Sequence, residues 1–260
     1  VNNDLPAKTV TVNHRGRTST HNESIFSYLE RELLARHVET EGLPFDFNGG
    51  YAGYLGYELK ADCGANAAHS SPTPEAAFVF ADRLIAFDHE EDIAYLVCLD
   101  DENHEARAKK WLNEMAERLQ QLEPIPQWSR ALHPQSVAQT FRHTPEHYLE
   151  LIAACKTEIR KGETYEVCLT NMITNHVEID PLNTYRALRS RNPAPYATYL
   201  NFPGVAVLSS SPERFLTIDP YGGVDAKPIK GARKRGKTVA EDEALYEDLQ
   251  TNEKDRSESL

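Results

Sequence analysis

The chain has 260 residues and a formal net charge of -12 at pH 7, because 40 acidic side chains outnumber 28 basic ones. A hydrophobic content of 40% and a charged content of 26% are ordinary for a globular protein. A chain of this length can bury one large core or two smaller ones. The negative charge argues against general binding to nucleic acid or to membranes, since both are polyanionic. No apolar stretch is long enough to span a bilayer, and no signal peptide is visible. The sequence thus predicts no nucleic acid and no membrane as partner.

Cysteine usage indicates the compartment. The chain has 4 cysteines, scattered without a CxxC pair, namely Cys63, Cys98, Cys155 and Cys168. This usage is typical of reduced thiols, so we expect a cytoplasmic location. The chain begins at Val1 and stops at Leu260 inside a helical pattern, and we expect a piece truncated at both ends.

The first half predicts strands and two amphipathic helices. Residues 9–12 alternate in polarity and suggest an edge strand, and residues 24–37 read as a helix capped by Ser24. Residues 47–58 interleave glycines with aromatics but match neither a dinucleotide nor a Walker loop, so a strand packed closely against another backbone is favoured. Residues 76–99 carry the clearest strand pattern, with apolar runs at 78–80, 84–87 and 93–99, and predict an antiparallel hairpin; residues 102–122 predict a helix. The polar stretch up to Gln139 is the candidate domain boundary, which divides the chain into 1–139 and 140–260.

The second half mixes helices and strands. Thr144 and Pro145 mark the start of a helix that Gly162 ends, and Asp180 caps a shorter one. We expect strands at 165–171, 196–202 and 205–210, a turn at 219–223, a strand leading to residue 227, and a helix from Glu241 onward. Helices with mostly antiparallel strands predict an α+β fold.

The stretch 224–236 carries the clearest chemical signal. Pro228 ends an extended run, Lys230 lies at its tip, and Gly231 permits a turn or the close approach of a ligand. A lysine held beside other cations binds its proton less tightly, which makes the amine a nucleophile near neutral pH. The basic cluster is also a candidate binding site, or anion well, for a small anion. The alternative is a solvated basic loop or a nucleic-acid patch.

Several motifs resemble component I of the chorismate-utilising enzymes, a family that includes anthranilate synthase and aminodeoxychorismate synthase. They are Gly-Glu-Thr-Tyr-Glu-Val-Cys-Leu-Thr at 162–170, Asn-Pro-Ala-Pro-Tyr at 192–196, Ser-Ser-Pro-Glu-Arg-Phe at 210–215, Pro-Ile-Lys-Gly at 228–231 and Glu-Lys-Asp-Arg-Ser-Glu at 253–258. The first half, with its 49–58 segment and hairpin, also looks like this family. The resemblance implies two large stacked antiparallel sheets flanked by helices. At position 230 the chain has lysine and so resembles the aminodeoxychorismate synthases, whereas anthranilate synthases have alanine there.

The resemblance implies a covalent amination. Lys230 would attack C2 of chorismate as the C4 hydroxyl departs, and ammonia would then add at C4 and expel the lysine, giving 4-amino-4-deoxychorismate for p-aminobenzoate and folate synthesis. Glu213 matches the family's general acid, a role that requires partial burial or a neighbouring negative charge. The alternative for Glu213 is an ion pair with Arg214 or Lys227 at a strand end.

The resemblance also implies a metal ion and a substrate loop. Glu258 matches a ligand of Mg²⁺, whose second carboxylate would lie beyond Leu260, so we expect the 260-residue chain alone to be inactive. Gly231 and Ala232 would contact the substrate through backbone N–H groups. Ala232 stands where the family usually has threonine, and a lost hydrogen bond of this kind costs on the order of 1 kcal/mol.

Two further partners follow from the resemblance. Pro195 and Tyr196 match the tryptophan effector pocket of relatives, although a proline-fixed turn before a strand is the simpler interpretation. Ammonia would come from a glutamine amidotransferase, as a separate subunit or a fused domain. Two alternatives stay open: anthranilate synthase, and a non-catalytic scaffold that binds a glutaminase or an effector.

Overall fold

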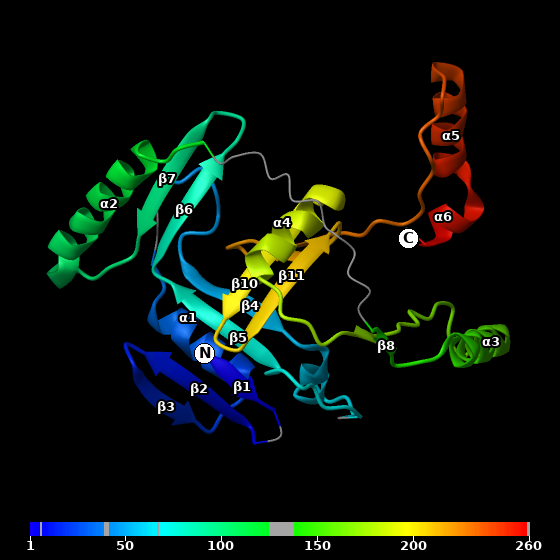
Figure 1. Cartoon of the computed structure of the whole chain (residues 1–260), viewed down its shortest axis with the longest axis horizontal. Helices are drawn as coiled ribbons and strands as arrows, with labels where there is room; N and C mark the ends of the chain where they lie inside the picture. The colour runs from blue at the N-terminus through cyan, green and yellow to red at the C-terminus, as the bar shows by residue number, and fades with distance from the viewer. Residues whose placement is uncertain (6, 39–41, 67, 125–137, 259–260) are drawn as a thin grey trace. The chain divides into compact units, whose positions relative to one another are not determined.

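The computed structural model describes residues 1–5, 7–38, 42–66, 68–124 and 138–258 (Figure 1). The chain divides into two compact units. Unit 1 comprises Val1–Gln127 and Leu200–Ala206, and unit 2 comprises Trp128–Tyr199 and Val207–Leu260. The domain boundary predicted near residue 139 stays a prediction, because most of the polar stretch before it lies outside the described residues.

Unit 1 is built on an antiparallel sheet with the strand order β3-β2-β1-β5-β4. The strands are β1 (Asn2–Asp4), β2 (Thr9–His14), β3 (Arg17–His21), β4 (Gly50–Leu55) and β5 (Ala76–Ala81). The prediction of an edge strand at 9–12 is wrong in one respect, because β2 lies between β1 and β3. A two-residue turn brings β3 alongside, and both Arg15 and Gly16 adopt positive φ there, 51° and 78°. Arginine is a weak signal for such a turn, so the sequence did not predict β3.

The glycine–aromatic segment is a strand in close backbone contact, as predicted. In β4, a Cβ atom placed on Gly53 would lie 2.0 Å from the carbonyl oxygen of Ala77 in β5. Gly53 is the Cα partner of Phe78, and Ala77 is the residue that precedes Phe78 on β5. Only glycine fits at this point, because any side chain would separate the two strands.

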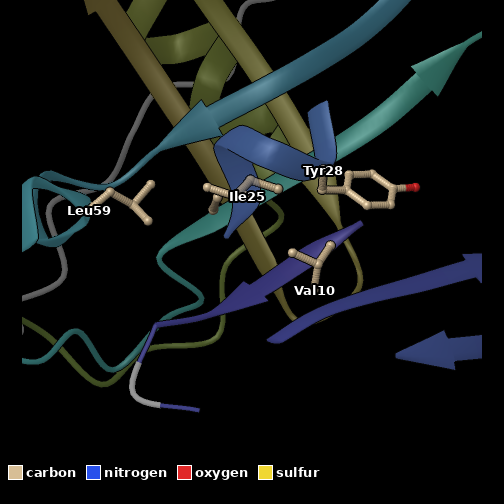
Figure 2. Packing of buried hydrophobic residues seen from close by; sticks show 5 residues of the cluster. Val10, Ile25, Tyr28 and Leu59 are labelled. Carbon is tan, nitrogen blue, oxygen red and sulfur yellow. The ribbon is translucent and has the colours of Figure 1, made fainter. Parts of the chain in front are cut away.

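The core of unit 1 forms where helix α1 (Ile25–Ala35) packs on the sheet. Ser24 caps α1 as predicted, and its Oγ accepts a hydrogen bond of 3.1 Å from the Ser27 amide. Figure 2 shows Val10, Ile25, Tyr28 and Leu59 of this core, with Leu59 coming from the short 3-10 helix η1 (Tyr57–Ala61). Val10 and Ile25 are fully buried. Apolar burial therefore joins α1, η1 and the sheet.

The predicted hairpin and helix complete unit 1. Strands β6 (Arg83–Asp88) and β7 (Ile93–Cys98) pair antiparallel in a continuous register. The helix expected at 102–122 begins as the 3-10 turn η2 (Glu102–His104) and continues as α2 (Glu105–Gln120). Helix α2 lies alongside β7, and the guanidinium of Arg83 stacks over the ring of Trp111.

Unit 2 holds the remaining helices and short strands. Helix α3 (Pro145–Lys161) is capped by Thr144 and ends at Gly162, which has a φ of 81°. Helix α4 (Pro181–Arg191) is capped by Asp180, which accepts a 2.6 Å hydrogen bond from the Asn183 amide. Two strand pairs lie wholly in unit 2, namely β8 (Thr140–Phe141) with β9 (Ile173–Thr174) and β12 (Arg214–Ile218) with β13 (Val224–Lys227). A third pair, β10 (Tyr196–Phe202) with β11 (Val205–Ser211), has the residues around its turn, Leu200–Ala206, assigned to unit 1.

Two expectations for unit 2 need correction. No regular strand covers 165–171, where the described backbone has only the short β9 just beyond it. The local bonds there come from side chains, such as the 2.9 Å hydrogen bond from the Tyr148 hydroxyl to the Leu169 carbonyl. The helix predicted from Glu241 begins earlier, as α5 (Val239–Thr251) capped by Thr238, and breaks at Asn252 before α6 (Glu253–Glu258).

The predicted α+β class is confirmed by the antiparallel sheets and the helices. All 4 cysteines are free thiols, as expected. Among the helices that the structure describes, none has both the length and the apolar composition needed to cross a bilayer.

Candidate functional site

The hairpin β12–β13 brings the two predicted catalytic residues to one end. Arg214 at the start of β12 is the Cα partner of Lys227 at the end of β13. Glu213 immediately precedes Arg214, and Lys230 follows Lys227 by three residues. Both residues therefore lie at the open end of this hairpin. The closed end is the predicted turn, in which Asp219 Oδ1 accepts hydrogen bonds from the amides of Tyr221 and Gly223 at 2.8 and 2.7 Å.

Lys230 faces a carboxylate. Its Nζ lies 3.8 Å from Glu166 Oε2, and the side chains of Lys230 and Glu166 are 32% and 55% exposed. We expected cations to surround this amine, but the ion pair that the structure provides is with an acid. A carboxylate at this distance attracts the ammonium form, whereas a nucleophile must be the neutral amine. Glu166 belongs to the motif at 162–170, but its pairing with Lys230 was not predicted.

Gly231 fixes the direction of the chain directly after the lysine. Its φ is +73°, and an added Cβ would lie 2.7 Å from Cγ of Asp255 and 3.1 Å from Cδ1 of Leu249. A side chain would thus be strained by the backbone and would collide with α6. The neighbouring Ala232 is exposed, and its carbonyl accepts a 3.1 Å hydrogen bond from Arg233 Nη1. The proposed substrate contact through the N–H groups of these two residues stays a prediction.

Two arginines fasten the loop after Lys230 to the C-terminal helices. Arg233 donates to Asp248 Oδ2 of α5 at 2.5 Å and to Asp255 Oδ2 of α6 at 2.7 Å. Arg235 binds both carboxylate oxygens of Asp242 at 2.8 and 2.6 Å. We call this set of contacts, from Arg233 and Arg235 to α5 and α6, the arginine latch. Since these arginines are occupied by carboxylates, they do not form the anion well expected of the basic cluster.

Electrostatics within the arginine latch favour the charged forms of its members. The hydrogen bonds that the Arg233 guanidinium donates to Asp248, and then to Asp255, raise its pKa. The hydrogen bond from Arg235, followed by one from the Gly236 amide at 2.7 Å, lowers the pKa of the Asp242 carboxyl below its ordinary 3.8. Asp255 is only 6% exposed, and Arg233 compensates its charge at close range.

Glu213 is exposed at the open end of the hairpin. The alternative of an ion pair with Arg214 is wrong, because that guanidinium binds Asp225 on β13. The partial burial expected of a general acid is also absent at Glu213 in this structure. Its backbone is held by Ser211, whose Oγ donates to the Glu213 carbonyl at 3.1 Å. The side chain of Glu213 thus extends into solvent from the open end of the hairpin.

The predicted effector residues lie where α4 passes into β10. Pro195 is in the turn before β10, and Tyr196 is the first residue of the strand, with 38% of its surface exposed. The hydroxyl of Ser210 donates a hydrogen bond to the carbonyl of Asn192, at the end of α4. The interpretation as a proline-fixed turn before a strand is confirmed, and tryptophan binding stays a prediction.

The sequence and the described part of the structure point to different places for a metal ion. Glu258 is the last residue of α6, and its side chain is outside the described part of the chain. In unit 1, ligand atoms of Asp100, Asp101 and His104 lie within 4.8 Å of one another. Arg107 binds Asp100 and lowers the pKa of that carboxyl, while Asp101 caps η2 and contacts His104 at 2.7 Å. These contacts account for the second group as part of a helix start.

Comparison with known proteins identifies the family. The sequence profile described as chorismate binding enzyme matches residues 4–260. The chain belongs to the chorismate-binding enzymes. An aminodeoxychorismate synthase of Streptomyces pristinaespiralis is 49% identical over 242 residues, covering 91% of this chain and 34% of the relative. One of Streptomyces griseus is 46% identical over 262 residues, covering 99% of this chain and 36% of the relative. The chain therefore spans about a third of the length of these relatives.

A solved structure supports the same fold. Anthranilate synthase component I of Streptococcus pneumoniae TIGR4 superposes with a TM-score of 0.69 at 22% identity, covering 99% of this chain and 60% of the other. At this identity the likeness concerns the fold. The predicted family and its α+β fold are thus confirmed.

Proposed function

We propose that this chain is the lysine-bearing part of an aminodeoxychorismate synthase, which replaces the C4 hydroxyl of chorismate by an amino group. The observation that supports the proposal is the register of the β12–β13 hairpin, in which Arg214 pairs with Lys227, so that Glu213 and the segment leading to Lys230 both extend from its open end. Further support comes from the two Streptomyces relatives, both named aminodeoxychorismate synthase. The product would serve p-aminobenzoate and folate synthesis.

The reaction proceeds through a covalent adduct. The neutral amine of Lys230 attacks C2 of chorismate, the double bond shifts, and the C4–O bond breaks. Glu213 gives its proton to the departing oxygen, which leaves as water. Ammonia then adds at C4, and the C2–N bond breaks with its electron pair returning to the lysine. Two easier substitutions replace one difficult substitution.

The exposed Glu213 must be protonated when substrate is bound. Chorismate carries two carboxylates, and a negative charge brought close to another carboxyl favours the protonated form of that carboxyl. The substrate itself thus supplies the neighbouring negative charge that an exposed general acid requires. The backbone N–H groups of Gly231 and Ala232 contribute hydrogen bonds to the substrate.

Glu258 is the proposed ligand of Mg²⁺. Carboxylate oxygen is the donor type that this ion prefers, so the chemistry of the residue fits. When bound, the ion would neutralise a substrate carboxylate. Asp255, one turn earlier on α6, is committed to Arg233 and is not proposed as a ligand.

Two partners belong to this proposal. Ammonia comes from a glutamine amidotransferase, as a subunit or a fused domain, because no nucleophilic cysteine is assigned to this chain. Tryptophan is the proposed effector at Pro195 and Tyr196. Bound tryptophan should protect the segment around Tyr196 from hydrogen exchange. Loss of this protection in a Tyr196→Ala variant would support the site, and unchanged protection would exclude it.

Replacement of the lysine tests the function. In the natural full-length protein with Mg²⁺ and ammonia, Lys230→Ala should abolish both the chorismate adduct seen by mass spectrometry and the formation of aminodeoxychorismate. Lys234→Ala, an exposed lysine of the same loop, is the matched control and should retain both. Anthranilate as the product would instead identify an anthranilate synthase. Turnover that is unaffected by Lys230→Ala would exclude the proposed chemistry, and absence of any turnover in the unaltered protein would favour the scaffold.

A further inference from the structure

The ion pair between Lys230 and Glu166 is the feature of the site that the proposed function does not yet use. Glu166 Oε2 lies 3.8 Å from the nitrogen that must attack the substrate. We propose that Glu166 is a positioning residue for Lys230, which holds the ammonium group in the resting enzyme and accepts its proton before the attack. This inference rests on the proposed function of Lys230.

Both partners are held by contacts on their own segments. The positive φ of Gly231 and the arginine latch fix the chain immediately after Lys230. On the other side, the hydroxyl of Thr164 donates to the Glu166 carbonyl at 2.7 Å and accepts from the Glu166 amide at 3.4 Å. These local bonds replace the strand ladder expected for 165–171. A carboxylate on so fixed a backbone restricts where the lysine amine can rest.

The chemistry requires a proton acceptor for this lysine. At a separation of 3.8 Å the amine and the carboxyl attract each other as ammonium and carboxylate, so a proton must move before the amine can attack. Substrate binding removes water from both groups, and desolvation disfavours two charges relative to the neutral acid and amine. Transfer of one proton from Nζ to Oε2 cancels both charges at once. When substrate covers the site, the neutral amine of Lys230 is therefore favoured, and its lone pair can attack.

The steps balance. The Lys230 proton goes to Glu166, and the amine lone pair forms the N–C2 bond while the C4–O bond breaks. The oxygen leaves as water with the proton of Glu213. When ammonia forms the C4–N bond, the electron pair of C2–N returns to lysine, which regains its proton from Glu166. The new ammonium group on the product gives one proton back to Glu213, so that chorismate and ammonia yield the amino product and water.

The test uses the natural full-length protein with added ammonia and Mg²⁺. Glu166→Gln keeps the size and the hydrogen-bonding oxygen of the side chain but is not a base. We expect kcat and the single-turnover rate of adduct formation to fall by about 100-fold or more, in the range for loss of proton transfer. KM should stay within about threefold, because substrate binding is not the affected step. The matched control is Glu163→Gln, which makes the same substitution at an exposed residue three positions earlier. It should leave kcat, KM and the rate of adduct formation unchanged.

Chemical rescue separates proton transfer from structure. Glu166→Ala should be slow, and added formate, a small carboxylate, should restore part of kcat. This variant also carries the test if Glu166→Gln does not fold. Unchanged adduct formation in Glu166→Gln, a loss that lies in KM alone, or no response of Glu166→Ala to formate would each overturn the role of Glu166. Normal turnover in Lys230→Ala would instead overturn the proposed function itself, so the two failures are distinguishable.

Discussion

Unit 1 and unit 2 are stabilised in different ways. In unit 1, α1 and the sheet bury a continuous apolar cluster that includes Val10, Ile25, Tyr28 and Leu59. Among the described residues of unit 2, the buried side chains are Ala187 and Asp255. Strands β12 and β13, next to the predicted catalytic residues, leave large apolar side chains such as Phe215 exposed, at 84%.

The difference shows what positions the candidate site. A two-stranded hairpin has marginal stability without further packing, so the loop after β13 depends on other contacts. Those contacts are the arginine latch, the contact of Gly231 with α6, and helix caps such as Thr238. Unit 1 is thus held mainly by apolar burial, and the lysine loop of unit 2 by directional polar bonds. Three experiments test this contrast, in order of decreasing expected effect.

The largest effect is expected in the core of unit 1. Ile25 is 0% exposed, so Ile25→Ala should lower the free energy of unfolding of unit 1 by about 2–5 kcal/mol through lost burial and a cavity. The control is Leu34→Ala on the same helix, where the side chain is 75% exposed and the change should stay within about 0.5 kcal/mol. Urea denaturation monitored by amide exchange in α1 and β2 measures both. Equal effects of the two variants would contradict the assigned core.

A smaller and more local effect is expected from the arginine latch. Arg233→Gln removes the charge that compensates the buried Asp255, so amides 229–236 should exchange about tenfold faster. Lys234→Gln removes a charge from an exposed neighbour and should leave exchange unchanged. Amides of α1 should not respond to either variant. If exchange in the loop is the same in Arg233→Gln and in the unaltered chain, the latch does not hold the lysine loop.

The smallest effect is expected from pH. The pKa of Asp242 is lowered in the folded state, mainly by Arg235. Its contribution to stability is therefore fully present above its ordinary pKa of 3.8 and is lost as the pH falls through the lower folded value. Exchange at Gly236, after correction for the intrinsic rate, should rise below about pH 4. In Asp242→Asn this acid-induced rise should be absent, and a rise of the same size in that variant would assign it to another group.

Features of the fold that depend on neighbouring residues could be predicted from the sequence. Ser24, Thr144 and Asp180 cap the expected helices, because a cap needs only a side-chain oxygen next to its own helix. The β6–β7 hairpin and the close contact at Gly53 also followed the pattern of the chain. The family was identified from motifs, which are linear by nature.

The arrangement within the site needed the tertiary structure. Charge alone could not select Glu166 as the partner of Lys230, or Asp255 as the partner of Arg233, from 40 acidic residues. The interior position of β2 and the missing strand at 165–171 likewise depend on which backbone lies alongside. Strand pairing and ion pairing join residues distant in the chain, and their energies depend on separation in space, which the order of residues does not specify.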